Sequence, residues 1–143
     1  MKKKFSLKVQ IIVADYYKDI TNSLTKSAME VLKKNQIDFD IMFVPGVYEI
    51  PQMIKWNIKK NKVNLFIALG CVIKGQTYHF EVISDSVGKA LLDLVNNNPN
   101  TLISNGIINA YKKKQALDRS KSNSKNKGQE AANAMIRMIQ CLI

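Results

Sequence analysis

Four apolar stretches rich in β-branched residues alternate along this chain with stretches whose apolar residues recur at helical spacing. The apolar stretches predict strands over residues 7–14, 39–44, 65–73 and 102–108. The amphipathic stretches predict helices over residues 20–35, 48–60, 79–95, 114–118 and 128–142. Strands that alternate with helices indicate an α/β protein, in which right-handed crossovers make the sheet parallel and place helices on both of its faces.

Length, composition and hydropathy indicate one soluble domain. The chain has 143 residues, 46% of them hydrophobic, so we expect residues 1–143 to fold around a core rather than remain disordered. The longest uninterrupted apolar run, 65–73, is too short to span a bilayer. The basic start resembles a signal peptide, but Lys8 and Gln10 interrupt the apolar run that a signal requires. We therefore expect a cytoplasmic protein with no membrane partner.

The strongly basic composition raises the possibility of a nucleic-acid partner. The chain carries 22 Lys and Arg against 11 Asp and Glu, a net charge of +11. However, the lysines are spread along the whole chain, and no nucleic-acid motif or aromatic platform accompanies a basic cluster. Nucleic-acid binding is therefore disfavoured.

The two cysteines, Cys71 and Cys141, both lie in apolar stretches. Two such residues form neither a disulfide framework nor a set of metal ligands. We expect two free, buried thiols in a reducing compartment.

Polar and aromatic residues gather just after the predicted carboxyl ends of the strands. Segments 15–17, 45–49 and 74–79 follow the first three strands, and residues 105–106 lie near the predicted end of the fourth. In open α/β sheets, ligands bind in the crevice at this edge. The sequence therefore predicts one composite site.

The segment between the third strand and its helix carries the strongest chemical signal. Gly75, Gln76 and Thr77 precede the predicted helix, where free backbone N–H groups and the positive helix end favour a phosphate, although many such turns bind nothing. His79 is the only histidine and stands in the first helical turn. A lone histidine is often a surface or core group, but an imidazole beside a phosphate site is also suited to proton transfer near neutral pH.

Other candidate residues each allow a structural and a functional interpretation. Glu49 at a helix start is favoured by the helix dipole, and it is also suited to accepting hydrogen bonds from a polyol. Tyr16 is either a packing residue or a ring that stacks on a planar heterocycle. Arg119 and Lys127 are either solvated charges or cations for a phosphate monoester. Composition favours a mobile, solvated connection for the polar segment 119–127 that holds them.

Together these segments resemble the signature segments of the lumazine synthases. The matching stretches are VPGVYEIP (44–51), ALGCVIKGQTYHFEVISDSV (68–87), NGI (105–107) and R-x7-KG (119–128). The second stretch is highly specific, and the resemblance covers nearly the whole chain in order and spacing.

The resemblance implies a flavodoxin-like, three-layer domain with a four-stranded parallel sheet in the order 2-1-3-4. It implies the condensation of 5-amino-6-(D-ribitylamino)uracil with 3,4-dihydroxy-2-butanone 4-phosphate, with no cofactor and no metal. It also implies a homopentamer whose active sites lie between adjacent subunits, and some members of the family stack pentamers into a 60-subunit shell.

The resemblance further implies roles for individual residues. His79 matches the proton-transfer residue, and Tyr16 matches the ring that stacks on the pyrimidine. Positions expected to contact the pyrimidine or the ribityl chain are Val47, Tyr48, Glu49, Cys71, Val72, Ile73, Asn105 and Lys127. Gln76, Thr77 and Arg119 match the phosphate-binding positions, with Arg119 reaching in from the neighbouring subunit.

Several positions depart from the family pattern. Tyr17 stands where asparagine is usual, Lys74 replaces a common arginine, and Val47 replaces a common alanine and narrows the pocket. The stretch 120–128 lacks the usual glycines and crowds lysines, so we expect a pentamer, with the shell as the alternative. A non-catalytic protein that binds ribityl ligands or flavin is the competing function. His79 together with Arg119 favours the enzyme, because storage requires neither proton transfer nor a phosphate contact.

Overall fold

The computed structural model describes residues 7–142, so the basic start of the chain lies outside the described residues. Its four strands pair in parallel in the order β2-β1-β3-β4, which confirms the predicted fold class and sheet order. The strands are β1 (Lys8–Ala14), β2 (Asp38–Val44), β3 (Leu65–Ile73) and β4 (Leu102–Ala110).

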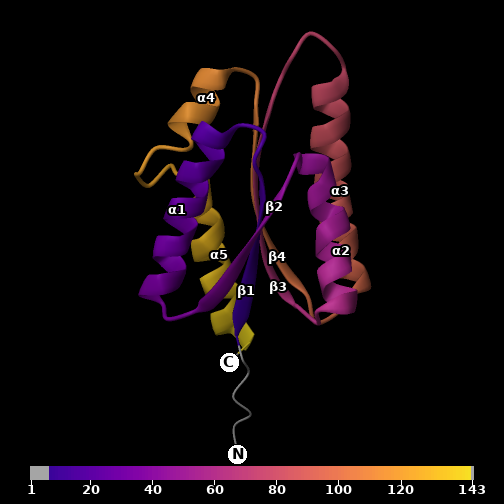
Figure 1. Cartoon of the computed structure of the whole chain (residues 1–143), viewed down its shortest axis with the longest axis vertical. Coiled ribbons are helices and arrows are strands. Elements are labelled where there is room, and N and C mark those ends of the chain that lie inside the picture. The colour runs from indigo at the N-terminus through magenta and orange to yellow at the C-terminus, as the bar shows by residue number, and fades with distance from the viewer. Residues whose placement is uncertain (1–6, 143) are drawn as a thin grey trace, which may run out of the picture.

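Helices cover both faces of the sheet and complete three layers (Figure 1). One face carries α1 (Lys18–Lys34), α4 (Lys113–Asp118) and α5 (Lys127–Leu142). The other carries the 3₁₀ turn η1 (Val47–Glu49), α2 (Ile50–Lys60) and α3 (His79–Asn97). The helix predicted over 48–60 is therefore divided into η1 and α2. In the described part of the chain, no helix has both the length and the apolar character needed to cross a bilayer.

The alternation of side chains along the strands produces two separate cores. On β1, Val9, Ile11 and Val13 pack toward α1 and α5, whereas Ile12 and Ala14 pack toward α2. All residues of β3 from 65 to 72 are buried, because helices cover both sides of this inner strand. That double coverage explains why β3 is the longest apolar run in the sequence.

Two helices end where the chain takes a left-handed backbone conformation. Gln36 after α1 and Lys62 after α2 both have φ of 57°. The next residue in each case donates its backbone N–H back into the helix, Ile37 to the carbonyl of Leu32 (3.0 Å) and Val63 to that of Asn57 (3.2 Å). These terminations turn the chain toward the start of the following strand.

The helices α1 and α5 approach each other with no side chain between them at Gly128. A methyl group on Gly128 would lie 2.7 Å from the carbonyl carbon of Leu24 and 2.8 Å from its Cα. Because those atoms belong to the backbone, they cannot rotate away from an added side chain.

We predict that Gly128→Ala lowers the free energy of unfolding by about 2–3 kcal/mol through this overpacking. The control is Gly88→Ala in α3, where nothing lies within 4 Å of an added Cβ. That change is expected to raise stability by up to about 1 kcal/mol, since alanine favours a helix over glycine. Denaturant unfolding at equal protein concentrations compares the two, and equal effects would contradict the close approach.

Candidate functional site

The carboxyl ends of the four parallel strands lie at one edge of the sheet, the upper edge in Figure 1. The structure brings three of the predicted segments to this edge: residues 15–17 after β1, η1 after β2, and residues 74–78 after β3. The Asp15 N–H donates to the Val44 carbonyl (3.0 Å), which joins the ends of β1 and β2. The candidate site is thus an exposed rim formed where the three crossovers leave β1, β2 and β3.

The turn η1 presents one buried and two accessible candidate side chains. Val47 is 6% exposed and packs in the core between β3 and α2, whereas Tyr48 is exposed and Glu49 is half-buried. The Glu49 N–H donates to the Gly46 carbonyl (3.2 Å). A methyl group on Gly46 would lie 3.2 Å from Glu49 Oε2, so the carboxylate folds back over this turn. Val47 therefore anchors the turn and leaves the polar groups at the rim.

Tyr16 is placed as a ring that is free to stack on a ligand. Its side chain is 76% exposed and meets Tyr17 edge to face, with ring centroids 5.0 Å apart. Tyr17 is half-buried, and burial, followed by the nearby Tyr16 and Cys71, raises the pKa of its hydroxyl. Tyr17 thus remains a neutral supporting residue beneath the exposed ring.

The segment after β3 exposes the predicted phosphate-binding turn. Gly75, Gln76, Thr77 and His79 are all exposed, and α3 begins at His79. The His79 backbone N–H lies 3.4 Å from Thr77 Oγ1, a long hydrogen bond that leaves the hydroxyl close to the helix end. Free N–H groups at the start of a helix favour an anion at this point.

An ion pair and a backbone hydrogen bond hold both sides of this segment. The Lys74 N–H donates to the Ala110 carbonyl (2.9 Å), and Lys74 Nζ lies 3.5 Å from Glu81 Oε1 in the first turn of α3. The same ammonium group lies 5.7 Å from the centre of the Tyr111 ring. These contacts fix the entry and exit of the turn while its centre stays accessible.

The end of β3 can offer a ligand little except its backbone. Cys71 and Val72 are buried, and Ile73 is half-buried. Burial, with a smaller contribution from the negative charge of Asp19, raises the pKa of the Cys71 thiol to about 12. The thiol is therefore protonated at neutral pH and is not a nucleophile. The second cysteine, Cys141, is exposed, so the expectation that both thiols are buried was wrong for Cys141.

Asn105 lies in the middle of β4, not near its end, and this part of the prediction was wrong. The strand continues to Ala110, and Asn105 pairs with Ala68 in the centre of β3. Five further residues at about 3.3 Å each place Asn105 roughly 17 Å from the end of β4, although the register sets it level with Ile12, two residues before β1 ends at Ala14. Its side chain is on the α3 side of the sheet, is exposed, and accepts a hydrogen bond from the Ile107 N–H (3.0 Å).

Arg119 and Lys127 lie on the opposite side of the sheet from His79. They flank the connection between α4 and α5, which covers the α1 face, whereas α3 covers the other face (Figure 1). Arg119 is exposed, and Lys127 Nζ pairs with Glu130 Oε1 at 3.3 Å. A single chain therefore does not bring Arg119 and His79 together.

The polar connection 119–127 is a closed, hydrogen-bonded turn rather than a fully solvated link. The Lys127 N–H donates to the Arg119 carbonyl (2.8 Å), which closes the turn at its base. Asn126 is completely buried; its Nδ2 donates to the Ser120 carbonyl, and its Oδ1 accepts from the Gln129 N–H, both at 3.0 Å. Asn126 thus caps α5 and fixes the backbone beside Arg119. Sequence reasoning missed this role, although an asparagine just before a helix is a known capping signal.

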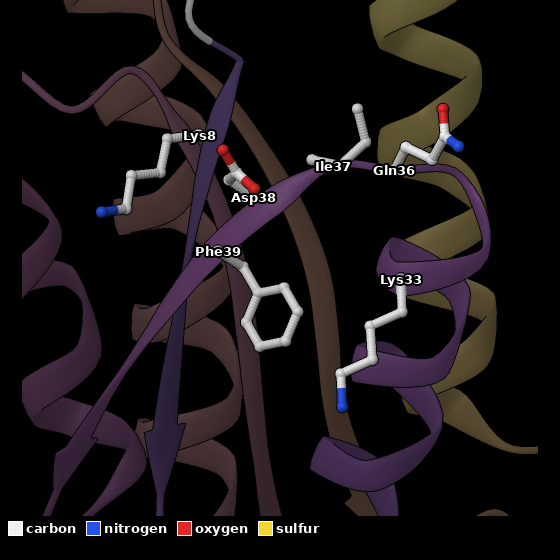
Figure 2. Close-up of a pocket in the computed structure, with 6 residues that line it drawn as sticks. All are labelled: Lys8, Lys33, Gln36, Ile37, Asp38 and Phe39. Atoms are coloured by element: carbon white, nitrogen blue, oxygen red, sulfur yellow. The ribbon is translucent and has the colours of Figure 1, made fainter.

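A hollow in the described surface lies at the other end of the molecule. It has a volume of about 510 Å³ and is formed where α1 leads into β2, beside the start of β1 (Figure 2). Its lining residues are Lys8, Lys33, Gln36, Ile37, Asp38 and Phe39. None of the predicted site residues lines this hollow, so it gives no support to a ligand site there. For residues 7–142, no group of three or more His, Cys, Asp or Glu side chains is placed to hold a metal ion.

Comparison with known proteins shows the family to which the chain is similar. The family model described as 6,7-dimethyl-8-ribityllumazine synthase matches residues 6–142. The chain belongs to this family. Proteins of that name are similar over most of their length: 42% identical in Bartonella bacilliformis (90% of this chain, 86% of that protein) and 36% identical in Kosmotoga olearia (92% and 86%). The relative in Buchnera aphidicola is 39% identical, over 94% of this chain and 86% of that protein.

In this member of the family, we predict that Asn126→Ala lowers the free energy of unfolding by about 1–3 kcal/mol. The substitution removes a helix cap and leaves the Ser120 carbonyl without its buried donor. The control is Asn123→Ala in the same turn, because the Asn123 side chain is exposed and accepts a hydrogen bond only from the Lys125 N–H. This control substitution is expected to lower the free energy of unfolding by less than about 0.5 kcal/mol. Denaturant unfolding measures both, and equal losses would show that Asn126 does not hold the turn.

Proposed function

We propose that this protein condenses 5-amino-6-(D-ribitylamino)uracil with 3,4-dihydroxy-2-butanone 4-phosphate to give 6,7-dimethyl-8-ribityllumazine, a step of riboflavin biosynthesis. The family match over residues 6–142 is the observation that carries the proposal. The reaction releases phosphate and takes place without a cofactor or metal. The amine condenses with the ketone to form an imine with loss of water, phosphate leaves, and the ring closes with loss of a second water.

The rim formed by β1, η1 and β3 is proposed to bind the ribitylaminouracil. The Tyr16 ring is able to stack on the pyrimidine because it is exposed at the rim and takes no part in the core. Val47 and the backbone of residues 71–73 form the floor, and the Glu49 carboxylate accepts hydrogen bonds from the ribityl hydroxyls. Tyr48 lies beside these groups at the rim.

The start of α3 is proposed to bind the phosphate of the second substrate. The N–H groups of Gln76 and Thr77 and the Thr77 hydroxyl supply donors, and Arg119 supplies a charge-assisted contact. His79 follows directly in the first turn of α3, where its imidazole is able to transfer protons between the reacting groups.

The placement of the residues supports sites shared between subunits. Because Arg119 and Lys127 lie across the sheet from His79, and Asn105 is exposed on the outer strand β4, they are proposed to serve the site of a neighbouring chain. Large apolar side chains left exposed on one chain also favour a subunit partner. These include Phe43, Trp56, Val82, Leu92 and Tyr111. We propose a cytoplasmic homopentamer in which residues 1–143 form one domain that acts on small molecules.

The competing role, a non-catalytic protein that binds ribityl ligands or flavin, has no observation in its favour among the residues described. A storage protein needs neither His79 next to a phosphate turn nor a cation such as Arg119. We therefore retain the enzyme alone.

Turnover tests the proposal directly. Purified protein mixed with both substrates at neutral pH is expected to form the lumazine chromophore and release one phosphate per turnover. Exhaustive chelation is expected to leave the rate unchanged. The absorbance of the lumazine chromophore and a phosphate assay measure the two products. An absence of product at high protein concentration would refute the proposed enzymatic function.

Two substitutions separate the proposed roles. His79→Ala is expected to lower kcat by about ten- to a thousandfold, with little change in substrate binding, because water replaces the imidazole only in part. Arg119→Ala is expected to raise KM for the butanone phosphate by about ten- to a hundredfold, because a charge-assisted contact contributes about 1.5–3 kcal/mol. Affinity for the ribitylaminouracil is expected to stay nearly constant. Equal losses for both substrates in Arg119→Ala would indicate a folding or assembly defect instead.

Light scattering at physiological salt determines the assembly. Five chains of 16.2 kDa give about 81 kDa, and a 60-subunit shell gives about one megadalton. We expect the pentamer, because lysines at 121 and 125 on the α4–α5 turn place like charges close together on a chain that already carries +11. A megadalton particle would contradict this expectation.

A further inference from the structure

We infer that Gly70 is a positioning residue that sets how closely η1 lies against the sheet, and so fixes the pocket for the pyrimidine half of the substrate. The inference rests on the proposed function, since it concerns the binding site of that reaction. Gly70 lies in β3, three residues before the strand ends at Ile73.

The packing at Gly70 leaves no room for a side chain. Gly70 is on the α2 side of the sheet, because it alternates with Ala68 and Val72, which face that core. A methyl group on Gly70 would lie 2.7 Å from Val47 Cγ2, 3.3 Å from Ala14 Cβ and 3.7 Å from Ile50 Cδ1. Two carbon atoms pack favourably at about 3.5–4.0 Å, so η1 sits roughly 1 Å closer to the strand than any other residue would allow.

The surrounding atoms cannot move away without moving the turn. Val47, Ala14 and Ile50 are all buried, at 6%, 2% and 0% exposure. The nearest atom belongs to a β-branched side chain, whose rotation about χ1 is restricted. An added methyl group would therefore displace the backbone of η1 rather than one flexible side chain.

The contact with Gly70 matters because the side chain that seats η1 on the sheet is Val47. The preceding Gly46 has no side chain to anchor the turn, and the flanking Pro45 is exposed. Tyr48 and Glu49 point to the rim, so Val47 is the member of η1 that is buried in the core. Any outward shift of Val47 carries the Glu49 carboxylate with it. A displacement of about 1 Å in a substrate-positioning group can reduce activity about a hundredfold.

The effect should be confined to one substrate. The phosphate-binding turn lies beyond the end of β3, where the Lys74 N–H is bonded to the Ala110 carbonyl. No atom of residues 74–79 is among the three nearest neighbours of an added Cβ at Gly70. The ribitylaminouracil therefore depends on Gly70, and the butanone phosphate does not.

Steady-state kinetics of Gly70→Ala tests this. We expect KM for the ribitylaminouracil to rise about ten- to a hundredfold, and KM for the butanone phosphate to change less than about threefold. The rescue variant is Gly70→Ala combined with Val47→Ala, which removes the atom that an added methyl would strike. Its KM for the ribitylaminouracil is expected to return close to that of Val47→Ala alone, so the two substitutions are strongly non-additive.

Gly106→Ala is the matched control. Gly106 pairs with Leu69 on the neighbouring strand, and an added methyl would lie 2.5 Å from Leu69 Cδ2 and 3.0 Å from Ala131 Cβ. This clash is at least as severe but faces α5, so it should lower the melting temperature while leaving the ratio of the two KM values unchanged.

Three results would overturn the inference: equal KM changes for both substrates in Gly70→Ala, no rescue in the double variant, or a shifted KM ratio in Gly106→Ala. If Gly70→Ala does not fold, the double variant must fold, because the clashing atom is absent; an insoluble double variant also overturns the inference. Lack of turnover by the unsubstituted protein would instead refute the proposed function.

Discussion

The inner strands β1 and β3 pair in parallel, and their paired residues run from the pair Val9 and Leu65 to the pair Val13 and Leu69. The outer strands β2 and β4 lie on either side of them. Since helices cover both faces of these inner strands, their backbone N–H and C=O groups can be satisfied only by neighbouring strands. Parallel pairing in turn requires a crossover helix between successive strands. It therefore directs all the carboxyl ends, with the loops that follow them, to one edge. Every proposed contact of η1 and of the turn before α3 depends on this arrangement.

The same arrangement divides the candidate residues between two faces. Crossovers on opposite sides of the sheet place α3 and its His79 on one side and the α4–α5 turn with Arg119 on the other. A fold of this kind leaves the rim open in one chain. In the proposed ring of identical chains, each site would be completed by the α4–α5 turn of one subunit, brought to the α3 rim of the next.

The sequence predicted the elements whose burial is regular. β3 was predicted correctly because burial on both faces of a strand leaves an unbroken apolar run. α1 was predicted correctly because burial along one helical stripe leaves apolar residues at helical spacing. The prediction ended β4 two residues early because Asn109 interrupts the apolar pattern. Asn109 is exposed on an edge strand, where polar residues are tolerated. Cys141 was taken as buried because its neighbours are apolar, but it falls outside the buried stripe of α5.

Other features of the site depend on distances that a sequence does not contain. Asn126 is polar and lies in a lysine-rich segment, yet its side chain is completely buried in the turn it holds together. Gly70 is one of several residues in an apolar strand. Only the position of Val47, which packs against the same face of the sheet, reveals that a methyl group cannot fit. The sequence motifs identified the candidate site residues, whereas tertiary packing determines how each segment is held in position.

Subunit complementation tests the central claim that each site takes His79 from one chain and Arg119 from another. Subunits carrying His79→Ala and subunits carrying Arg119→Ala are mixed, dissociated and reassembled, and mass spectrometry verifies that mixed rings form. At a butanone phosphate concentration near the KM of the unsubstituted protein, each parent assembly is expected to be only weakly active, one through its low kcat and the other through its raised KM. In an equal mixture, about a quarter of the sites receive both unsubstituted residues. The account predicts that activity rises toward a quarter of that of the unsubstituted protein. Mixed rings that stay as inactive as their parents would show that His79 and Arg119 act from the same chain.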